Sequence, residues 1–286
     1  MVTTPLESAD ISRITQRASL YEKTEKYYRA ILELAQEKGI PIAVVISPYA
    51  GIYEGEQQIY NTAEDIASEY GIPFINCNLL INEIGIDYST DAADTAHLNY
   101  KGNQKFSSYI GAWLKDRFAI SVHTDEQKYA TWQRDADFIR QMCANQVLVE
   151  TYDINVISEL IQNPYYRIMI SVDGSCSTSD ANLSPFFNKI GIDGEALTGI
   201  WLKEDNQLLW YSGIETAERF IEDSSHDFCM ERSLNDSGQY VNHMIVDNVQ
   251  YQKVINGINV LVYDKKTEKI ADVFGIDMDA RYCIVK

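Results

Sequence analysis

The sequence predicts an α/β fold in its N-terminal part, followed by a helical connector and a smaller α+β domain. In the first 120 residues, short apolar runs alternate with longer segments whose apolar residues recur every three or four positions. This order is typical of a parallel sheet with crossover helices. From Tyr165 onward, alternating branched and aromatic residues between turn signals indicate strands and hairpins. We therefore expect three parts, covering residues 1–120, 121–164 and 165–286.

The N-terminal part contains three expected helices and two expected strands. Apolar residues at helical spacing predict helices over 18–38, 54–70 and 100–118. In the first of these helices, the apolar positions are Leu20, Tyr27, Ile31, Leu34 and Ala35. The runs 40–46 and 73–78 are apolar and bounded by helix breakers, which is typical of buried parallel strands. Two strands bury the faces of such a sheet poorly, so we expect an upstream segment, a partner chain or the C-terminal domain to complete it.

Composition excludes several classes of function. The chain has 286 residues, a hydrophobic content of 45% and a formal net charge of −18. This charge argues against nucleic acid and against anionic membrane surfaces as partners. The five cysteines are scattered without a Cys-x-x-Cys pair, so we expect no metal site, no disulfide framework and no cofactor. No apolar run is long enough to span a membrane and no signal peptide is recognisable, which makes the cytoplasm the default location.

The segment 91–102 holds the residues that point to chemistry. Asp94 lies three residues before His97, and Asn99 follows where it can cap a helix. If Asp94 and His97 share a helical turn, the carboxylate can accept a hydrogen bond from the ring Nδ1. Nε2 is then free to act as a general base, as in a nucleophilic triad. The alternative is a surface aspartate and a capping asparagine around an incidental histidine.

The pattern Asp94-Thr-Ala-His97-Leu-Asn99-Tyr-Lys-Gly102, followed by an amphipathic helix, resembles the last sequence block of the SGNH (GDSL-type) hydrolases. The strand 42–46 with the following Ser47-Pro48, and the strand 73–77, also fit, so the resemblance covers about residues 20–135. It implies a partial flavodoxin-like sheet, with Asp94 as triad acid, His97 as triad base and an acyl ester, such as an O-acetylated sugar, as substrate. The family's Gly-Asp-Ser and Gly-x-Asn-Asp blocks, which supply the nucleophile and an oxyanion-hole side chain, have no counterpart in the sequence.

Other candidate residues carry weaker signals. Ser47 follows the first strand and is the one serine of this region that we consider as a replacement nucleophile, although a loop serine before a proline is the more common explanation. His123, His226 and His243 have no partner at a regular spacing, and we expect none of them to be catalytic or metal-binding. In the connector, an apolar stripe indicates packing and comprises Trp132, Phe138, Ile139 and Met142.

The C-terminal part resembles the interleukin-like EMT inducer domain in a few short pieces. These are Ile168-Met-Ile-Ser-Val-Asp-Gly174, the helix ending at Lys189-Ile-Gly191, Gly257-Ile-Asn-Val-Leu-Val-Tyr263 and Phe274-Gly-Ile-Asp277. Such a domain would suggest recognition of glycans or of a protein partner rather than catalysis.

Three hypotheses of function follow. The first is an SGNH-type ester hydrolase or acyl transferase that acts on an O-acylated carbohydrate and is inactive alone, because a missing upstream segment or a partner chain supplies the nucleophile. The second is a non-catalytic carbohydrate- or protein-binding module derived from a hydrolase. The third is a scaffold for the assembly of a cell-surface polysaccharide.

Overall fold

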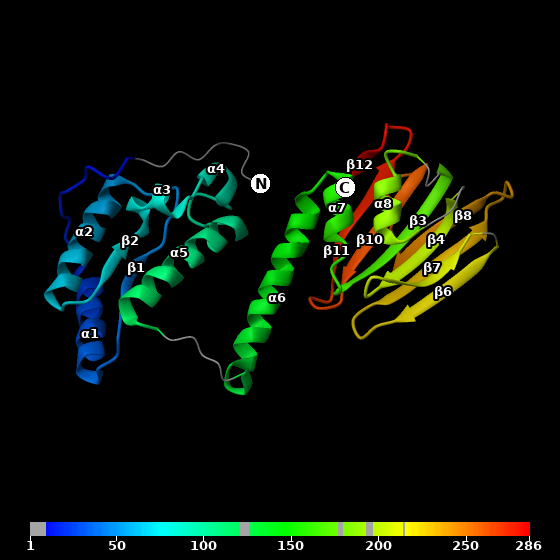
Figure 1. The fold of residues 1–286 in the computed structure, drawn as a ribbon. Helices are drawn as coiled ribbons and strands as arrows, with labels where there is room; N and C mark the ends of the chain where they lie inside the picture. Colours follow the sequence, from blue (N-terminus) through cyan, green and yellow to red (C-terminus); the bar gives the residue numbers. More distant parts are fainter. Residues whose placement is uncertain (1–9, 121–125, 177–179, 193–196, 214) are drawn as a thin grey trace. The chain divides into compact units, whose positions relative to one another are not determined.

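The computed structural model describes residues 10–120, 126–176, 180–192, 197–213 and 215–286 (Figure 1). The chain divides into two compact units, Met1–Thr124 and Asp125–Lys286. The first unit holds a parallel pair of strands with helices, and the second holds antiparallel sheets with helices. The expected mixed α/β class is confirmed at this level. The segment 121–164, expected as a separate connector, contributes its helices to the second unit.

The sheet of the first unit consists of β1 (Val44–Ile46) and β2 (Phe74–Asn76), which pair in parallel with Val44 opposite Phe74. Three longer helices surround it, α1 (Glu22–Lys38), α2 (Glu54–Glu69) and α5 (Tyr100–Phe118), together with the short turns η1 (Cys77–Leu79), α3 (Ile81–Ile84) and α4 (Tyr88–Asp91).

The two faces of this small sheet are covered by different helices. Val44 and Phe74 join the cluster around Leu32 of α1 and Ile66 of α2. The alternate residues of the strands, with Ile75 among them, join a second cluster that includes α5 side chains. Because successive side chains of a strand point to opposite faces, the sheet lies between α1 and α2 on one side and α5 on the other.

Local sequence signals fix the ends of these helices. Gly39, with a φ of 62°, ends α1 in the left-handed conformation that glycine adopts at little cost. The Asn99 side chain accepts hydrogen bonds from the backbone N–H groups of Lys101 and Gly102, so it caps α5 as predicted. The predicted apolar pattern of α1 is only partly turned inward: Ala35 is buried, whereas Tyr27, Ile31 and Leu34 remain more than half exposed.

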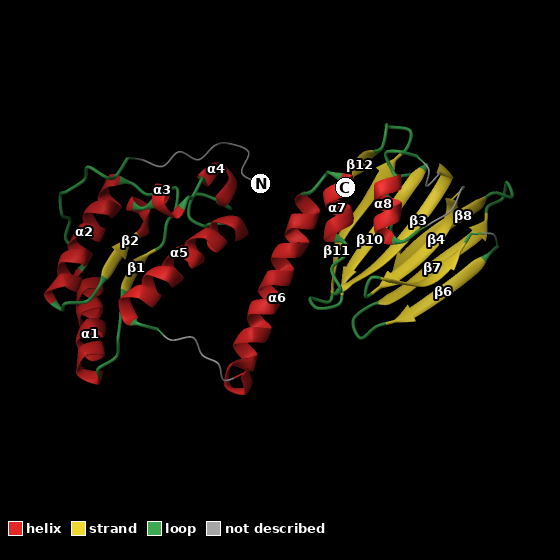
Figure 2. Ribbon diagram, in the orientation of Figure 1, coloured by secondary structure: helices red, strands yellow, loops and turns green. Residues whose placement is uncertain are grey.

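The second unit is built on a six-stranded antiparallel sheet (Figure 2). Its strands, in spatial order, are β12 (Cys283–Val285), β11 (Lys269–Asp277), β10 (Gly257–Asp264), β3 (Tyr166–Cys176), β4 (Leu197–Glu204) and β5 (Gln207–Ser212). The described residues of this unit form three helices, α6 (Glu126–Glu150), α7 (Ile154–Leu160) and α8 (Ser184–Ile190). One face of the sheet packs on these helices, in a core that includes Leu148, Ile157 and Phe187.

The other face of this sheet packs on a second sheet, of four strands. These are β6 (Ala217–Glu222), β7 (Asp227–Leu234), β8 (Tyr240–Val246) and β9 (Val249–Gln250). Met169 and Leu261 of the larger sheet meet Phe228 and Met244 of the smaller one in a shared core. The strands and hairpins that the sequence indicates after Tyr165 are confirmed at β4–β5 and β10–β11, whereas no individual strand of the four-stranded sheet was predicted. Within the described residues, no helix combines the length and apolarity that crossing a membrane requires.

Candidate functional site

Asp94 and His97 lie together in the loop between α4 and α5. The ring Nδ1 of His97 is 2.9 Å from Asp94 Oδ1 and 3.0 Å from Oδ2. Because a carboxylate can only accept, Nδ1 donates the hydrogen bond, and this leaves the Nε2 lone pair of a neutral ring free. The arrangement is that of a general base with its orienting acid.

The contact does not arise from a helical turn, and that part of the prediction is wrong. Residues 93–96 form a bend outside the helices, in which Asp94 Oδ1 accepts hydrogen bonds from the backbone N–H groups of Ala96 (2.7 Å) and His97 (2.8 Å). Aspartate favours this kind of turn because its short side chain can bond to the backbone two or three residues ahead. The Ala96 N–H group, followed by the His97 ring, holds the pKa of Asp94 below its usual value.

The loop that carries His97 is closed on itself and is bonded to two neighbouring segments. Its own ends pair at an isolated bridge between Ala92 and Leu98. The Thr95 carbonyl accepts a 2.7 Å hydrogen bond from the backbone N–H of Gly51, in the loop after β1. Asn99 Nδ2 donates to the Thr90 carbonyl at 2.7 Å. The His97 loop therefore lies beside the carboxyl end of β1, where open α/β sheets bind ligands.

A network of buried amides holds the loop after β1. The Asn78 side chain accepts a hydrogen bond from the Tyr49 backbone N–H at 3.0 Å and donates one to the Ser47 carbonyl at 3.3 Å. Asn76 accepts from Asn78 and donates to the Gln57 side chain of α2 at 2.8 Å. These asparagines were not predicted as part of the site, although two amides at the end of a parallel strand are a detectable signal in the sequence.

Ser47 does not complete a triad in this structure. The residue is exposed at the end of β1, and among the described residues no hydrogen bond joins its hydroxyl to His97. The dyad is open to solvent, with 74% of the His97 side chain and 58% of the Asp94 side chain exposed. The hollows found among the described residues of the first unit lie elsewhere. One is lined by residues such as Lys105 and Tyr109 of α5, and another by the C-terminal ends of α1 and α2, the segments that follow them and Phe118 of α5.

The remaining histidines fall in other settings. His123 lies outside the described residues. His226 Nδ1 is 2.5 Å from Asp247 Oδ2, and this hydrogen bond raises the pKa of His226 above its usual value. His243 lies on β8 opposite Glu231, and its Nδ1 is buried without a hydrogen-bond partner. Among the described residues, no group of three or more histidine, cysteine, aspartate or glutamate side chains could hold a metal ion.

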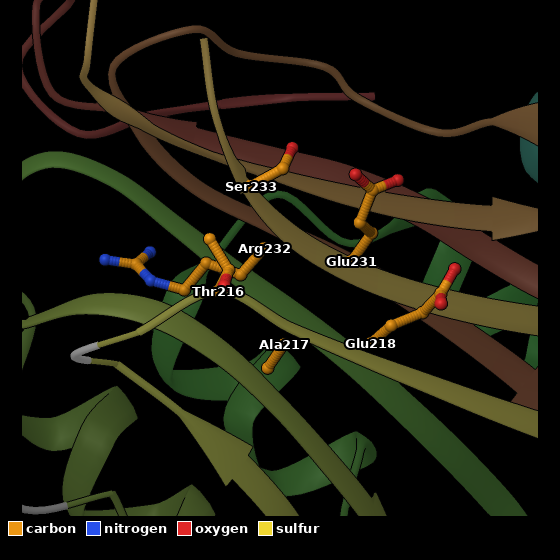
Figure 3. Close-up of a pocket in the computed structure, with 6 residues that line it drawn as sticks. All are labelled: Thr216, Ala217, Glu218, Glu231, Arg232 and Ser233. Atoms are coloured by element: carbon orange, nitrogen blue, oxygen red, sulfur yellow. The ribbon is translucent and has the colours of Figure 1, made fainter.

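A hollow of about 420 Å³ lies on the four-stranded sheet and is lined by Thr216, Ala217, Glu218, Glu231, Arg232 and Ser233 (Figure 3). Glu218 and Glu231 are paired across β6 and β7, and their carboxylates lie on the same side. The Arg232 guanidinium points the other way, into the protein, where it donates to Asn242 at 2.7 Å. The hollow is therefore acidic, and it contains none of the residues that the sequence predicts as catalytic.

The comparisons with known proteins add no family to this geometry. No family model, no curated protein and no solved structure matches the chain.

Proposed function

We propose that the first unit carries the acid and the base of an SGNH-type ester hydrolase or acyl transferase, within a partial flavodoxin-like sheet. The observation that carries the proposal is the hydrogen bond between Asp94 and His97 Nδ1, at 2.9 Å, in a loop bonded to the carboxyl end of β1. His97 Nε2 would take the proton of a serine hydroxyl and later give it to the leaving alcohol. Asp94 would stabilise the imidazolium that forms in between.

The nucleophile of this reaction is proposed to come from an upstream segment or from a partner chain that also adds strands to the sheet. Two observations support this. β1 pairs with β2 and, among the described residues, with no strand on its other side. All three residues of β1 remain partly exposed although they are apolar, as expected for a strand that lacks a neighbour. The substrate is proposed to be an acyl ester, such as an O-acetylated carbohydrate.

The first experiment measures hydrolysis of a fluorogenic acetyl ester and labelling by a serine-directed phosphonate. We expect the chain to resist labelling and to hydrolyse the ester only slowly, because without a nucleophile His97 can only activate water. His97→Ala should abolish this slow hydrolysis, whereas Ser47→Ala should leave it unchanged. His226→Ala is the matched control, since it removes another histidine whose ring is hydrogen-bonded to an aspartate.

The outcomes of this experiment are distinct. Rapid turnover with phosphonate labelling at Ser47 would show that the chain contains its own nucleophile, against the proposal. Hydrolysis that persists in His97→Ala would remove His97 from the mechanism.

A non-catalytic binding module is the second candidate, and the exposure of the dyad favours it. Catalysis gains from a site that excludes water, whereas the His97 side chain is 74% exposed. In this case the second unit, with its two stacked sheets, would recognise a glycan or a protein. Binding of an O-acetylated oligosaccharide that is retained in His97→Ala, together with no hydrolysis above the ester's spontaneous rate, would support this candidate over the hydrolase.

A further inference from the structure

Helix α6 has one face packed on its own unit. Gln141 and Leu148 are buried on this face, and Asn145 Nδ2 donates a 2.7 Å hydrogen bond to Asp264 of β10. These three residues are separated by four and three positions, so they lie on the same face of a helix with 3.6 residues per turn. They fix how the helix is rotated relative to the sheet beside it (Figure 2).

Over residues 129–143, the opposite face of α6 is also apolar. At 100° per residue, Trp132, Ile139 and Cys143 lie about 160–200° around the helix from Gln141. Trp132 is 78% exposed and Ile139 is 57% exposed. A helix that packs on its unit through one face normally shows polar side chains on the other, so this second apolar face is unexplained by the fold of the unit.

The apolar residues of this face follow a heptad spacing. They are Tyr129, Trp132, Ala136, Ile139 and Cys143, separated by three, four, three and four positions. We call these five residues the seam. This is the a and d pattern through which two helices form a coiled coil. The bulky Trp132 is followed by the small Ala136, which leaves room for two indole rings in one layer.

The charges beside the seam favour two parallel copies. In this pattern Asp135 takes the g position and Arg140 the following e position, the two sites that pair between parallel helices. Both side chains are about two-thirds exposed. Each Asp135 would face Arg140 of the second copy, so opposite charges would meet twice in one dimer. An exposed intrahelical bond from Arg140 to Asp137 competes only weakly with this pairing.

We propose that two copies of this chain associate through α6 as a parallel, in-register, two-stranded coiled coil. The seam lies opposite the face that packs on the second unit, so the second units of the two copies would lie on the outer sides of the helix pair. The proposal does not depend on the hydrolase chemistry, and its tests do not use activity.

Sedimentation equilibrium of the full chain tests the association, from micromolar to near-millimolar concentration. We expect a reversible dimer, whose dissociation constant rises by about 100-fold or more in Ile139→Glu, because each copy then places a charge in the seam. Thr131→Glu is the matched control: it adds the same charge to the same helix at an exposed position outside the seam, and it should leave the dimer intact. A chain that stays monomeric at all concentrations, or equal effects of the two variants, would overturn the proposal.

Cys143 tests the orientation, because the two Cys143 side chains face each other only in the parallel, in-register arrangement. Diamide removes two protons and two electrons from such a thiol pair and is itself reduced to the hydrazine. We expect a covalent dimer that is lost in Cys143→Ser and retained in Cys283→Ser, which removes an exposed thiol elsewhere. A dimer that Ile139→Glu dissociates but that diamide does not cross-link through Cys143 would rule out the parallel arrangement.

Discussion

The carboxylate of Asp91 is buried and lies 2.6 Å from the ammonium group of Lys105, in the next helix of the chain. The same carboxylate accepts a 2.8 Å hydrogen bond from the backbone N–H of Asp87. The Asp91 carbonyl accepts a 2.8 Å hydrogen bond from the Asn99 N–H. Asp91 thus fastens both the start of α4 and the start of α5, and the His97 loop lies between these two helices.

Removing the cation should weaken this region. Lys105→Met leaves the buried Asp91 carboxylate with two neutral partners, the Asp87 backbone N–H and the Thr90 hydroxyl. We expect a loss of about 2 kcal/mol of local stability, below the full cost of breaking a buried pair because Lys105 is partly exposed. Hydrogen exchange of the α5 backbone amides measures this loss. Lys115→Met removes an exposed lysine of the same helix and should change exchange little. Equal protection in both variants would show that the ion pair does not hold the loop.

The close approach of α5 to α4 depends on a glycine. A Cβ atom at Gly102 would lie 2.4 Å from the Asp91 carbonyl oxygen, which is backbone and cannot rotate away. Gly102→Ala should therefore push the helix start away and destabilise the first unit by about 2 kcal/mol. Gly111 lies in the same helix, and a Cβ atom there would meet nothing within 4 Å beyond the adjoining backbone of its own helix, so Gly111→Ala should instead stabilise it by about 1 kcal/mol. Thermal unfolding of the two variants should give shifts of opposite sign.

The sequence predicted most of the first unit because its signals are local. Glycine stops, the Asn99 cap and short apolar runs each depend on a few adjacent residues. The three long helices and the two strands lie within the predicted segments, although each strand spans only three residues and the short helical turns between β2 and α5 were not predicted. The faces of α1 were harder to predict. Tyr27, Ile31 and Leu34 share a helical stripe and are all exposed, because the position of the small sheet decides which stripe is covered.

The chemistry of the site was predictable only in part. The spacing of Asp94 and His97 was sufficient to predict their contact, although the turn that makes it is not helical. The supporting residues were not predictable, because Asp91 meets Lys105 and Asn78 meets Tyr49 through the tertiary fold. In the same way, the His226 ring is hydrogen-bonded to Asp247, which lies 21 positions further along the chain, and not to the adjacent Asp227.

A buried lysine in the second unit should make its stability depend on pH. Lys203 is only 3% exposed, and among the described residues no hydrogen bond or ion pair to its ammonium group is found. Burial lowers the pKa of Lys203 below its usual value of 10.5. As the pH falls through the interval between 10.5 and the lower folded pKa, the unfolded chain takes up a proton first, and stability is lost.

Replacing this lysine should therefore stabilise the fold. Lys203→Met keeps the length of the side chain and removes the buried charge, and we expect a gain of about 1 kcal/mol at neutral pH. The gain should shrink as the pH rises toward 10.5 and vanish above it, where the lysine becomes neutral in both the folded and the unfolded state. Thermal unfolding at several pH values measures both effects. A loss of stability at neutral pH would show that the ammonium group has a favourable partner.

The pairing of His226 with Asp247 gives a pH dependence of the opposite sign. The hydrogen bond to Asp247 raises the pKa of His226 in the folded state, so its contribution is fully present below the unfolded pKa, about 6.5, and is lost as the pH rises through the folded value. Asp247→Asn should lower the pKa of His226 toward its usual value, with only a small loss of stability at pH near 5, because half of the Asp247 side chain is exposed to solvent. NMR titration of the ring protons measures the pKa directly.

Asp227→Asn is the control: it changes the adjacent carboxylate, which does not bond the ring, so the pKa of His226 should change only slightly. If the two variants shift the titration equally, the general negative charge of this region, and not the specific hydrogen bond, sets the pKa of His226.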